Sequence, residues 1–491
     1  MTRHETRTVR AAAIWGGLGL AIVLVAAACA STPVPTPSSA QSTAPAVTAT
    51  ASLATPGSPV PTVAVSPTAT PRPAWQAFTT TGYLNNLVVG PDGTLYLAAG
   101  GPSNAAAVVA LDPAGQARPG WPYKPSDANV FAINLAPDGT VYVVSGGNST
   151  AGAGHLVALG PAGQPRPGWP VVLKSAPFSL TFGSDGTTYF AGSAGGGTDD
   201  HLYALDAAGR PKPGWPVAVP GVNGSLVLAA DGSVYIGAAT FTSTSITSRI
   251  YAFGPDGKPK PGWPLPRTDL QSPMVASDGT LYAQSNQQSG KVYAFAPDGK
   301  PKPGWKVATL PGFVSETATG LAGSVYVAVS LGNPAYHSVL ELDSTGAPKA
   351  GWKPYTLPRG MYLYPLVVGP SGVLYVPLAK AAANNSSVPG PDVALGPSGL
   401  PLPAWPKDVI DSLGGPKLGP DGTAYVASGS QVYAFAPDGT AVSGWPYRLP
   451  AAYTYANITI GPDGTVYVVG GGKAGATVVA LTPAGKPVGQ Q

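Results

Sequence analysis

Residues 120–166 read GWPYKPSDANVFAINLAPDGTVYVVSGGNSTAGAGHLVALGPAGQPR. Within this stretch, a Pro-Asp-Gly turn separates two apolar segments, and a Gly-rich loop, the segment HLVALG and a second turn follow. Asp-Gly flanked by β-branched and aromatic residues is a strong hairpin signal. After residue 74 we find no capped stretch with a helical period, so the sequence predicts an all-β fold.

The same order of segments recurs nine times, with tryptophans 40–53 residues apart. Periods of this size are typical of solenoids and propellers. Each first turn has a glycine, which adopts positive φ at low cost, and a tyrosine stands three residues later. We number the units 1 to 9 in the order of these glycines, which are Gly93, Gly139, Gly186, Gly232, Gly279, Gly323, Gly372, Gly422 and Gly464. The tyrosines are Tyr96, Tyr142, Tyr189, Tyr235, Tyr282, Tyr326, Tyr375, Tyr425 and Tyr467. The tryptophans, which we expect to be structural wedges between units, are Trp75, Trp121, Trp169, Trp215, Trp263, Trp305, Trp352, Trp405 and Trp445.

Each unit predicts four antiparallel strands, a to d, with strand d carrying the Gly-Trp-Pro motif. Four-stranded sheets repeated radially form a β-propeller. Proline after tryptophan predicts that strand d lies at the outer edge, because proline cannot donate to a central ladder. Mostly small residues six positions before the turn aspartate place strand a next to the axis.

The two ends of the repeat region complement each other. Unit 9 finishes as VVALTPAGKPVGQQ without a tryptophan, and the region begins with PRPAW, which ends at Trp75. We therefore expect residues 75–491 to form a single propeller of about nine four-stranded blades, closed by pairing of its N- and C-terminal parts. Eight blades plus one irregular copy is the alternative.

The first 29 residues have the layout of a secretory signal peptide. Arg3, Arg7 and Arg10 precede an uncharged apolar run, residues 11–28, which ends in Ala-Ala-Ala before Cys29. This stretch resembles the signal of bacterial lipoproteins, and the resemblance implies that Cys29 carries a lipid. The alternative is an uncleaved anchor, because 18 apolar residues can just span a bilayer.

Residues 30–74 form a Pro-, Ser-, Thr- and Ala-rich segment without charge before Arg72. Such a composition predicts a disordered, semi-rigid tether. We expect the chain to be extracytoplasmic and anchored to a membrane through its N-terminal lipid.

Composition excludes several classes of protein. The 27 basic and 23 acidic residues leave a net charge of +4, and the absence of a basic block argues against nucleic-acid binding. One cysteine and four histidines exclude a disulfide scaffold, a Cys-rich zinc site and an iron–sulfur cluster. We expect no metal, no cofactor and a monomer.

The stretch ALDPAGQARPGW, residues 110–121, resembles the tryptophan-docking motif of the PQQ-like (quinoprotein-type) propeller repeats. The alanine is present in eight units, with Glu341 in the sixth, while the motif aspartate appears only at Asp112, Asp206 and Asp343. The resemblance covers residues 75–491 and implies a propeller. Some family members are quinone-dependent dehydrogenases that hold calcium and the quinone with carboxylates.

A quinone-dependent extracytoplasmic oxidoreductase is one alternative function. The propeller region has no cysteine to stack on a quinone ring, and the predicted inner strands carry one acid, Glu316. Calcium prefers several oxygen ligands, carboxylates among them. We therefore expect no catalytic residue and no enzyme activity.

Two faces of the predicted ring differ. One carries the turns, where we expect an inner ring of turn aspartates and an outer ring of basic residues that serve solubility. The other carries every length variation, and variable loops on a rigid scaffold are common binding sites. Tyr and Arg are enriched at interface hot spots. On that face we predict a binding patch of Tyr336, Tyr355, Arg359, Tyr362, Tyr364, Tyr447, Arg448, Tyr453 and Tyr455.

The resulting hypothesis is a non-enzymatic lipoprotein whose propeller is a scaffold for a protein or ligand at the cell surface or in the periplasm. The lipoprotein propeller of the outer-membrane protein assembly machinery is an analogue by architecture. Carbohydrate or cell-wall binding through the tyrosines is a further alternative.

Overall fold

The structure is a computed structural model of the 491-residue chain. It describes residues 75, 77–80, 82–100, 106–126, 129–146, 154–173, 177–192, 200–241, 246–287, 290–331, 336–381, 387–407, 409–410, 415–450, 453, 455–472 and 475–489. These residues belong to one compact unit. The predicted signal peptide, Cys29 and the tether lie outside the described residues.

The strands of the first five units follow the predicted hairpins. Unit 1 has β2 (Tyr83–Val89), β3 (Leu95–Gly100) and β4 (Ala107–Leu111). Unit 2 has β5 (Asn129–Leu135), β6 (Val141–Gly146), β7 (Gly154–Leu159) and β8 (Val171–Leu173). Unit 3 has β9 (Phe178–Phe182), β10 (Thr188–Ala191), β11 (His201–Leu205) and β12 (Val217–Ala218). Unit 4 has β13 (Val222–Leu228), β14 (Val234–Phe241) and β15 (Ile246–Phe253). Unit 5 has β16 (Leu270–Val275), β17 (Leu281–Ser285), β18 (Lys291–Phe295) and β19 (Ala308–Thr309).

Units 6 to 9 contain the irregular copies. Unit 6 has β20 (Phe313–Thr319), a short 3-10 turn (Leu321–Gly323), β21 (Val325–Leu331), β22 (Tyr336–Leu342) and β23 (Tyr355–Thr356). Unit 7 has β24 (Met361–Leu363), β25 (Val367–Val368), β26 (Leu374–Val376), β27 (Leu378–Ala381), β28 (Ser387–Pro389) and β29 (Val393–Leu395). Unit 8 has β30 (Lys417–Leu418), β31 (Ala424–Ser428), β32 (Gln431–Phe435) and β33 (Tyr447–Arg448). Unit 9 has β34 (Tyr455–Ile460), β35 (Val466–Gly472) and β36 (Gly475–Leu481), joined by β1 (Phe78–Thr80) from the other end of the chain.

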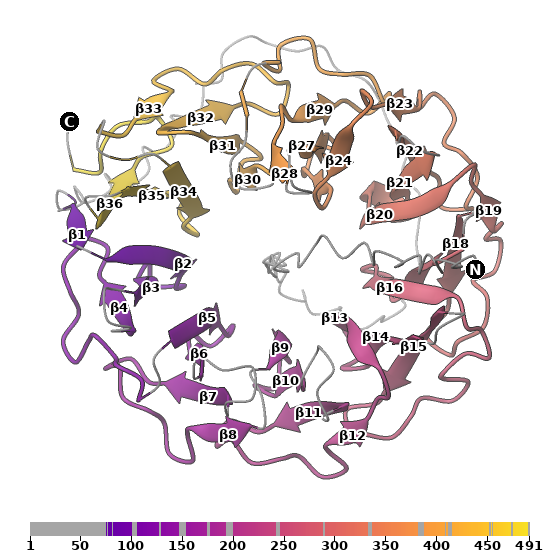
Figure 1. Ribbon diagram of the computed structural model, residues 1–491, viewed down its shortest axis with the longest axis horizontal. Coiled ribbons are helices and arrows are strands. Elements are labelled where there is room, and N and C mark those ends of the chain that lie inside the picture. The colour runs from indigo at the N-terminus through magenta and orange to yellow at the C-terminus, as the bar shows by residue number, and fades with distance from the viewer. Residues whose placement is uncertain are drawn as a thin grey trace, which may run out of the picture. The chain divides into compact units, whose positions relative to one another are not determined.

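The sheets are antiparallel and follow one another around a common centre, which is the arrangement of a β-propeller (Figure 1). Eight units each form one sheet, and unit 7 forms two. In the described residues six sheets have four strands, while those of units 1 and 4 and both sheets of unit 7 have three. The all-β propeller fold is therefore confirmed. Nine blades, with eight as the alternative, stay a prediction for the complete ring.

The turn chemistry explains why each unit folds as a hairpin. All nine turn glycines have φ between 75° and 83°, a region that costs glycine little. In unit 1 the Asp92 carboxylate accepts the backbone N–H of Thr94 at 3.0 Å, which closes an Asx turn. Past the turn, strand b is buried on both sides, so its side chains supply the hydrophobic clusters between neighbouring sheets.

Tyrosine and tryptophan pack as one pair in every unit. Their ring centroids lie 5.2–5.6 Å apart in all nine pairs, and seven of the tyrosines are among the largest fully buried side chains. The Tyr282 and Tyr326 hydroxyls donate to the turn carbonyls of the next unit, Gly323 and Gly372. The Trp121 indole N–H likewise donates across to the Pro161 carbonyl of unit 2, at 3.1 Å. These side chains therefore join neighbouring sheets.

The predicted position of strand d is wrong. The residues before the tryptophan form a tight turn, with the Trp169 N–H donating to the Arg166 carbonyl, and β8 begins two residues after Trp169. The end of strand c is already paired with residues that precede this turn, because Leu159 forms an antiparallel bridge with Pro165. The motif thus reverses the chain before the outer strand begins, and the proline precedes that strand.

The ends of the repeat region meet in one sheet. Strand β1 pairs with β36, Phe78 opposite Val478, and Figure 1 shows the indigo strand beside the yellow one. The Trp75 N–H donates to the Val488 carbonyl at 3.0 Å, as the Trp121 N–H does to Arg118 in unit 1. The C-terminal residues therefore supply the turn before the tryptophan, and Trp75 fills the tryptophan place. Pairing of the N- and C-terminal parts is confirmed.

Candidate functional site

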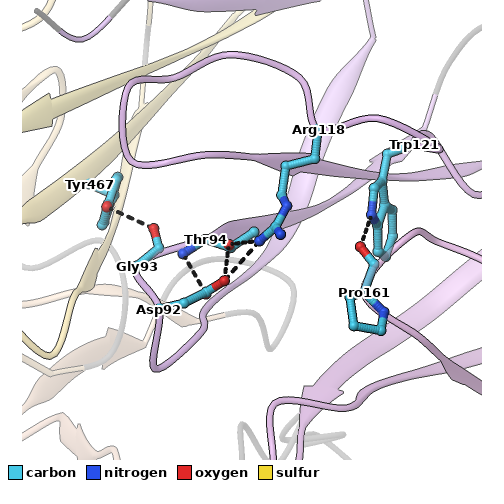
Figure 2. A network of polar contacts seen from close by, with 7 residues as sticks. All are labelled: Asp92, Gly93, Thr94, Arg118, Trp121, Pro161 and Tyr467. Atoms are coloured by element: carbon cyan, nitrogen blue, oxygen red, sulfur yellow. Dashed lines mark hydrogen bonds and ion pairs between the residues drawn. The ribbon is translucent and has the colours of Figure 1, made fainter. Parts of the chain in front are cut away.

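We call the side that carries the a–b and c–d turns the turn face, and the side that carries the b–c loops and d–a connections the connection face. On the turn face, Asp92 accepts hydrogen bonds from the Thr94 hydroxyl at 2.8 Å and from Arg118 Nη1 at 2.8 Å (Figure 2). The Tyr467 hydroxyl of unit 9 donates to the neighbouring Gly93 carbonyl at 3.3 Å. One turn thus holds both an ion pair and the contact that joins unit 9 to unit 1.

The aspartate–cation pair recurs in units 1 to 5. The later pairs are Asp138–Arg166 at 3.6 Å, Asp185–Lys212 at 2.9 Å, Asp231–Lys260 at 3.1 Å and Asp278–Lys302 at 3.2 Å. The expected inner acidic and outer basic rings are therefore a single set of ion pairs in these units. The turn face is locally neutral there, which makes it a poor electrostatic attractor for a charged ligand.

The ion pairs hold the turn carboxylates ionised. The hydrogen bond from Lys212 lowers the pKa of Asp185 to about 2, although partial burial acts in the opposite direction. For Asp92, burial alone would raise the pKa, and the hydrogen bonds from Thr94 and Arg118 outweigh it, so the pKa is lowered. These carboxylates are structural anions of the turns.

Unit 6 changes the pairing. Its turn has Ala322 in place of the aspartate, and Lys349 instead pairs with Glu341 at 2.7 Å. Glu341 is 1% exposed, and no hydrogen-bond donor among the described residues contacts its Oε2. In units 7 to 9 the cation position holds Leu402, Val442 and Val488, so the second half of the turn face has apolar side chains where the first half has ion pairs.

Four members of the predicted tyrosine and arginine patch lie in one segment of the connection face. Tyr355 is half-buried in β23, Arg359 is exposed in the β23–β24 connection, and Tyr362 in β24 is 50% exposed. Tyr364 follows that strand, and its N–H donates to the Pro377 carbonyl at 3.0 Å. Burial raises the pKa of the Tyr355 hydroxyl, so Tyr355 contributes to packing while Tyr362 faces solvent.

The remaining members lie elsewhere. Tyr447, Arg448 and Tyr453 belong to the β33–β34 region, where Tyr447 and Tyr453 pack against the hydrophobic cluster between units 8 and 9. Burial raises the pKa of Tyr447. The side chains of Tyr336 and Tyr455 lie outside what the structure describes. The seven members whose side chains the structure describes therefore form two groups, one in units 6 and 7 and one in units 8 and 9.

The first group stands on an unusual piece of sheet. In unit 7 the a, b and c strands are each interrupted, which divides the sheet into β25–β26–β29 and β24–β27–β28. Pro365, Pro377 and Pro391 lie in the three interruptions. The Asp392 carboxylate, 3% exposed, accepts the Leu378 N–H at 3.1 Å just beyond Pro377. The carboxylate satisfies a buried backbone donor that the broken ladder leaves.

Several polar groups escaped the sequence-based prediction. Between units 4 and 5, Arg267 makes two hydrogen bonds of 3.0 Å to Asp269 and stacks over the Tyr293 ring at 4.2 Å. The Ser285 hydroxyl donates to the same aspartate at 3.0 Å. Two of these groups could have been found from the sequence, because the repeat departs from its pattern at or near them. Glu341 replaces an alanine, and three prolines mark the interruption near Asp392. For the Arg267 network we see no such signal.

Glu316, the single acid of the predicted inner strands, lies on β20 opposite Ala328. Burial raises the pKa of its carboxyl to about 7, and no described residue donates a hydrogen bond to it. Within the described ranges, no group of three or more His, Cys, Asp or Glu side chains is placed to hold a metal ion. The part of the chain that the structure describes also contains no helix long and apolar enough to cross a membrane.

Comparisons with known proteins agree on the fold alone. No family model and no curated protein matches the sequence. A solved structure described as a eukaryotic initiation factor is 12% identical, covers 77% of this chain and 91% of its own, and has a TM-score of 0.50. The structure of the Dos1 propeller is 10% identical over 83% of this chain and 94% of its own, with a TM-score of 0.43. A streptogramin B lyase is 15% identical over 82% of this chain and 96% of its own, with a TM-score of 0.35. At these identities, fold likeness does not transfer an activity.

Proposed function

We propose that this protein is an extracytoplasmic lipoprotein of the PQQ-like repeat type, anchored through Cys29, whose propeller is a non-enzymatic scaffold that binds a partner on its connection face. The tether of residues 30–74 holds the propeller away from the membrane in this proposal. The assignment of the repeat family rests on the tryptophan motif in residues 75–491.

One observation supports the binding face above the others, namely the contrast between the two faces. The turn face of units 1 to 5 repeats the same internally paired charges. The connection face carries the length variation and the divided sheet of unit 7, with Tyr362 half exposed. A rigid ring that varies on one side is the usual layout of a binding scaffold.

The membrane anchor and the binding face are tested separately in cells that produce the full chain. Wild-type protein is expected in the membrane fraction, and Cys29→Ser is expected in the soluble extracytoplasmic fraction. For the face, a photo-crosslinking amino acid is placed at position 362 on the connection face or at position 400 on the turn face. Leu400 is 48% exposed, so the two probes are matched in accessibility. Cross-links confined to position 362 support the proposal, and equal cross-linking from both positions contradicts it.

The non-enzymatic part has its own test. Calcium and pyrroloquinoline quinone are added to the purified chain, and the absorbance of protein-bound quinone is measured after gel filtration. We expect no bound quinone, because Glu316 is the single acid on the inner strands that the structure describes. Stoichiometric retention of the quinone would favour the oxidoreductase alternative.

A further inference from the structure

Among the histidines that the structure describes, His337 on β22 is the buried one. Its side chain is 6% exposed, whereas His155 and His201 on strand c of units 2 and 3 are half-buried. No described residue makes a hydrogen bond with either ring nitrogen of His337. Burial lowers the pKa of this ring, because a desolvated cation without partners is costly. The folded chain therefore holds His337 neutral.

The register of unit 6 places the His337 ring on the side that faces unit 7. His337 lies opposite Ser330. Two residues further on, Val339 lies opposite Ala328. Cross-strand partners and alternate residues of a strand share one face, and this face packs in the cluster that contains Met361 of β24. The histidine thus lies in the contact between unit 6 and the small sheet β24–β27–β28, which we call the second sheet of unit 7 (Figure 1).

The titratable and charged groups around this contact do not compensate a positive ring. They are Glu341 with its partner Lys349 on the same face, Tyr355 on β23, Arg359 in the β23–β24 connection, and Lys380 opposite Met361 on β27. The Glu341 carboxylate is four residues from His337, about 13 Å along the strand, and Arg359 and Lys380 carry the same sign as a protonated ring. Residues 332–335 and 382–386, which adjoin β22 and β27 outside the described residues, contain no titratable side chain.

The second sheet of unit 7 is the smaller partner in this contact. Its strands have three, four and three residues. The Tyr364 N–H donates to the Pro377 carbonyl at 3.0 Å, and the Leu378 N–H donates to the Asp392 carboxylate at 3.1 Å, where this sheet meets the rest of unit 7. Small elements with few hydrogen bonds open locally at a lower free-energy cost than unfolding of the whole domain. Opening of this sheet away from unit 6 exposes the His337 ring to water.

We propose that His337 makes the contact between unit 6 and the second sheet of unit 7 sensitive to acid, because a proton that its ring takes from solvent stabilises the open arrangement and weakens the closed one. Tyr362 lies on this sheet, so the contact regulates the proposed binding face, and this consequence rests on the proposed function. A histidine in water has a pKa of about 6.5, and that of buried His337 is lower. The closed contact is therefore at full strength above about pH 6.5 and weakens as the pH falls from there towards the lowered pKa.

Hydrogen exchange of the purified full chain, followed by mass spectrometry at about pH 7.5 and about pH 5, tests this proposal. Protection is corrected for the effect of pH on intrinsic exchange and is compared between the second sheet of unit 7 and strands β26 and β29 of the same unit. In wild type, we expect the protection of the second sheet to fall by about 5- to 30-fold at the lower pH, because 1.5 units below a pKa of about 6.5 favours the open state by up to about 30-fold. Strands β26 and β29 should change by less than about twofold.

Three variants separate the ring from other effects of acid. His337→Leu and His337→Gln keep an uncharged side chain at both pH values, so the protection of the second sheet should agree between them within about twofold. Two replacements are used because one of them can disturb packing, and circular dichroism at neutral pH checks that each is folded. His201→Leu removes a half-buried histidine from strand c of unit 3 and should keep the wild-type response.

Failure of this inference is distinguishable from failure of the scaffold proposal. Unchanged protection of the second sheet at the lower pH, a wild-type response in both His337 variants, or equal loss of protection in β26 and β29 would each overturn the acid-sensitive contact. Cross-links confined to position 362 in cells would still support the scaffold in these cases. An acid response that needs His337, together with equal cross-linking from positions 362 and 400, would support the contact and contradict the scaffold.

Discussion

At the scale of single residues, the most informative positions are those where a repeat departs from its own pattern. Eight units have alanine at one position of strand c, and unit 6 has Glu341 there. A buried carboxylate is stable only when it is paired, because desolvation of the charge is costly. Lys349 supplies that pairing, and burial, with a smaller effect of Glu341, raises the pKa of Tyr326 to about 12.

Removal of the Lys349 charge tests this pairing. We expect Lys349→Met to lower the free energy of unfolding by about 3–5 kcal/mol, because it leaves a buried charge uncompensated. The matched change Lys302→Met removes a cation whose partner, Asp278, is half exposed, and it should cost less than about 1 kcal/mol. The double variant Lys349→Met with Glu341→Ala restores the composition of the other units and should recover most of the loss. Urea unfolding measures all three, and equal losses for Lys349→Met and Lys302→Met would refute the argument.

Glu316 predicts a pH dependence of stability. Its pKa rises from 4.5 to about 7 in the folded chain, so between these values the folded state binds more protons than the unfolded state. Stability from this group is fully present below about pH 4.5 and is lost as the pH rises through 7. Replacement by Glu316→Gln should make the chain more stable than wild type at pH 8, by up to about 3 kcal/mol, and nearly equal at pH 4.5. Denaturation midpoints at the two pH values check this, and a pH-independent difference would contradict it.

At the scale of elements, the turns determine where each hairpin forms, and the interruptions determine whether its sheet stays in one piece. All nine first turns have a positive-φ glycine, seven of them also have an aspartate that closes an Asx turn, and the length of each hairpin then varies beyond its tyrosine. Unit 7 differs in another way, because its three strands break at one level and the broken ends are held by side-chain and turn hydrogen bonds. This break divides the sheet of unit 7 into two small sheets.

The Asp392 carboxylate is expected to hold that second sheet in place. Asp392→Ala leaves the buried Leu378 N–H without its acceptor, which should cost about 1–3 kcal/mol. Hydrogen exchange followed by mass spectrometry should show faster exchange in residues 378–390, while β26 and β29 keep their protection. Uniform loss of protection across unit 7 would show that the two sheets are not independent.

At the scale of the molecule, closure turns a string of repeats into a ring. Open repeat arrays unfold in pieces, because each unit contacts only its neighbours. Here Trp75 and β1 complete the sheet of unit 9, and the Tyr467 hydroxyl bonds to Gly93 of unit 1. Every sheet therefore has two neighbours.

The closure predicts the response to Trp75→Ala. Loss of this ring removes its contact with Tyr467, at 5.4 Å between centroids, and should cost about 3–5 kcal/mol. Because the sheets are coupled around the ring, we expect one cooperative thermal transition at a lower temperature. Calorimetry of wild type, Trp75→Ala and Trp445→Ala checks this, with Trp445 as the matched position inside the chain. A separate early transition in Trp75→Ala alone would show that unit 9 can detach and that the ring is not coupled.

The sequence by itself determined the repeat, the turns, the tyrosine and tryptophan positions and the joining of the two ends. These follow from local preferences, since an Asp-Gly turn and alternating apolar residues act within a few residues and are repeated. Only the tertiary structure decided that the turn aspartates of units 1 to 5 pair with cations 24–29 residues later. It also decided that strand d begins after the tryptophan, and that Tyr355 is packed while Tyr362 is exposed. Pairing and exposure depend on which strands become neighbours and how far each hairpin extends past the next. Those quantities are set by contacts between units, which no single stretch of sequence contains.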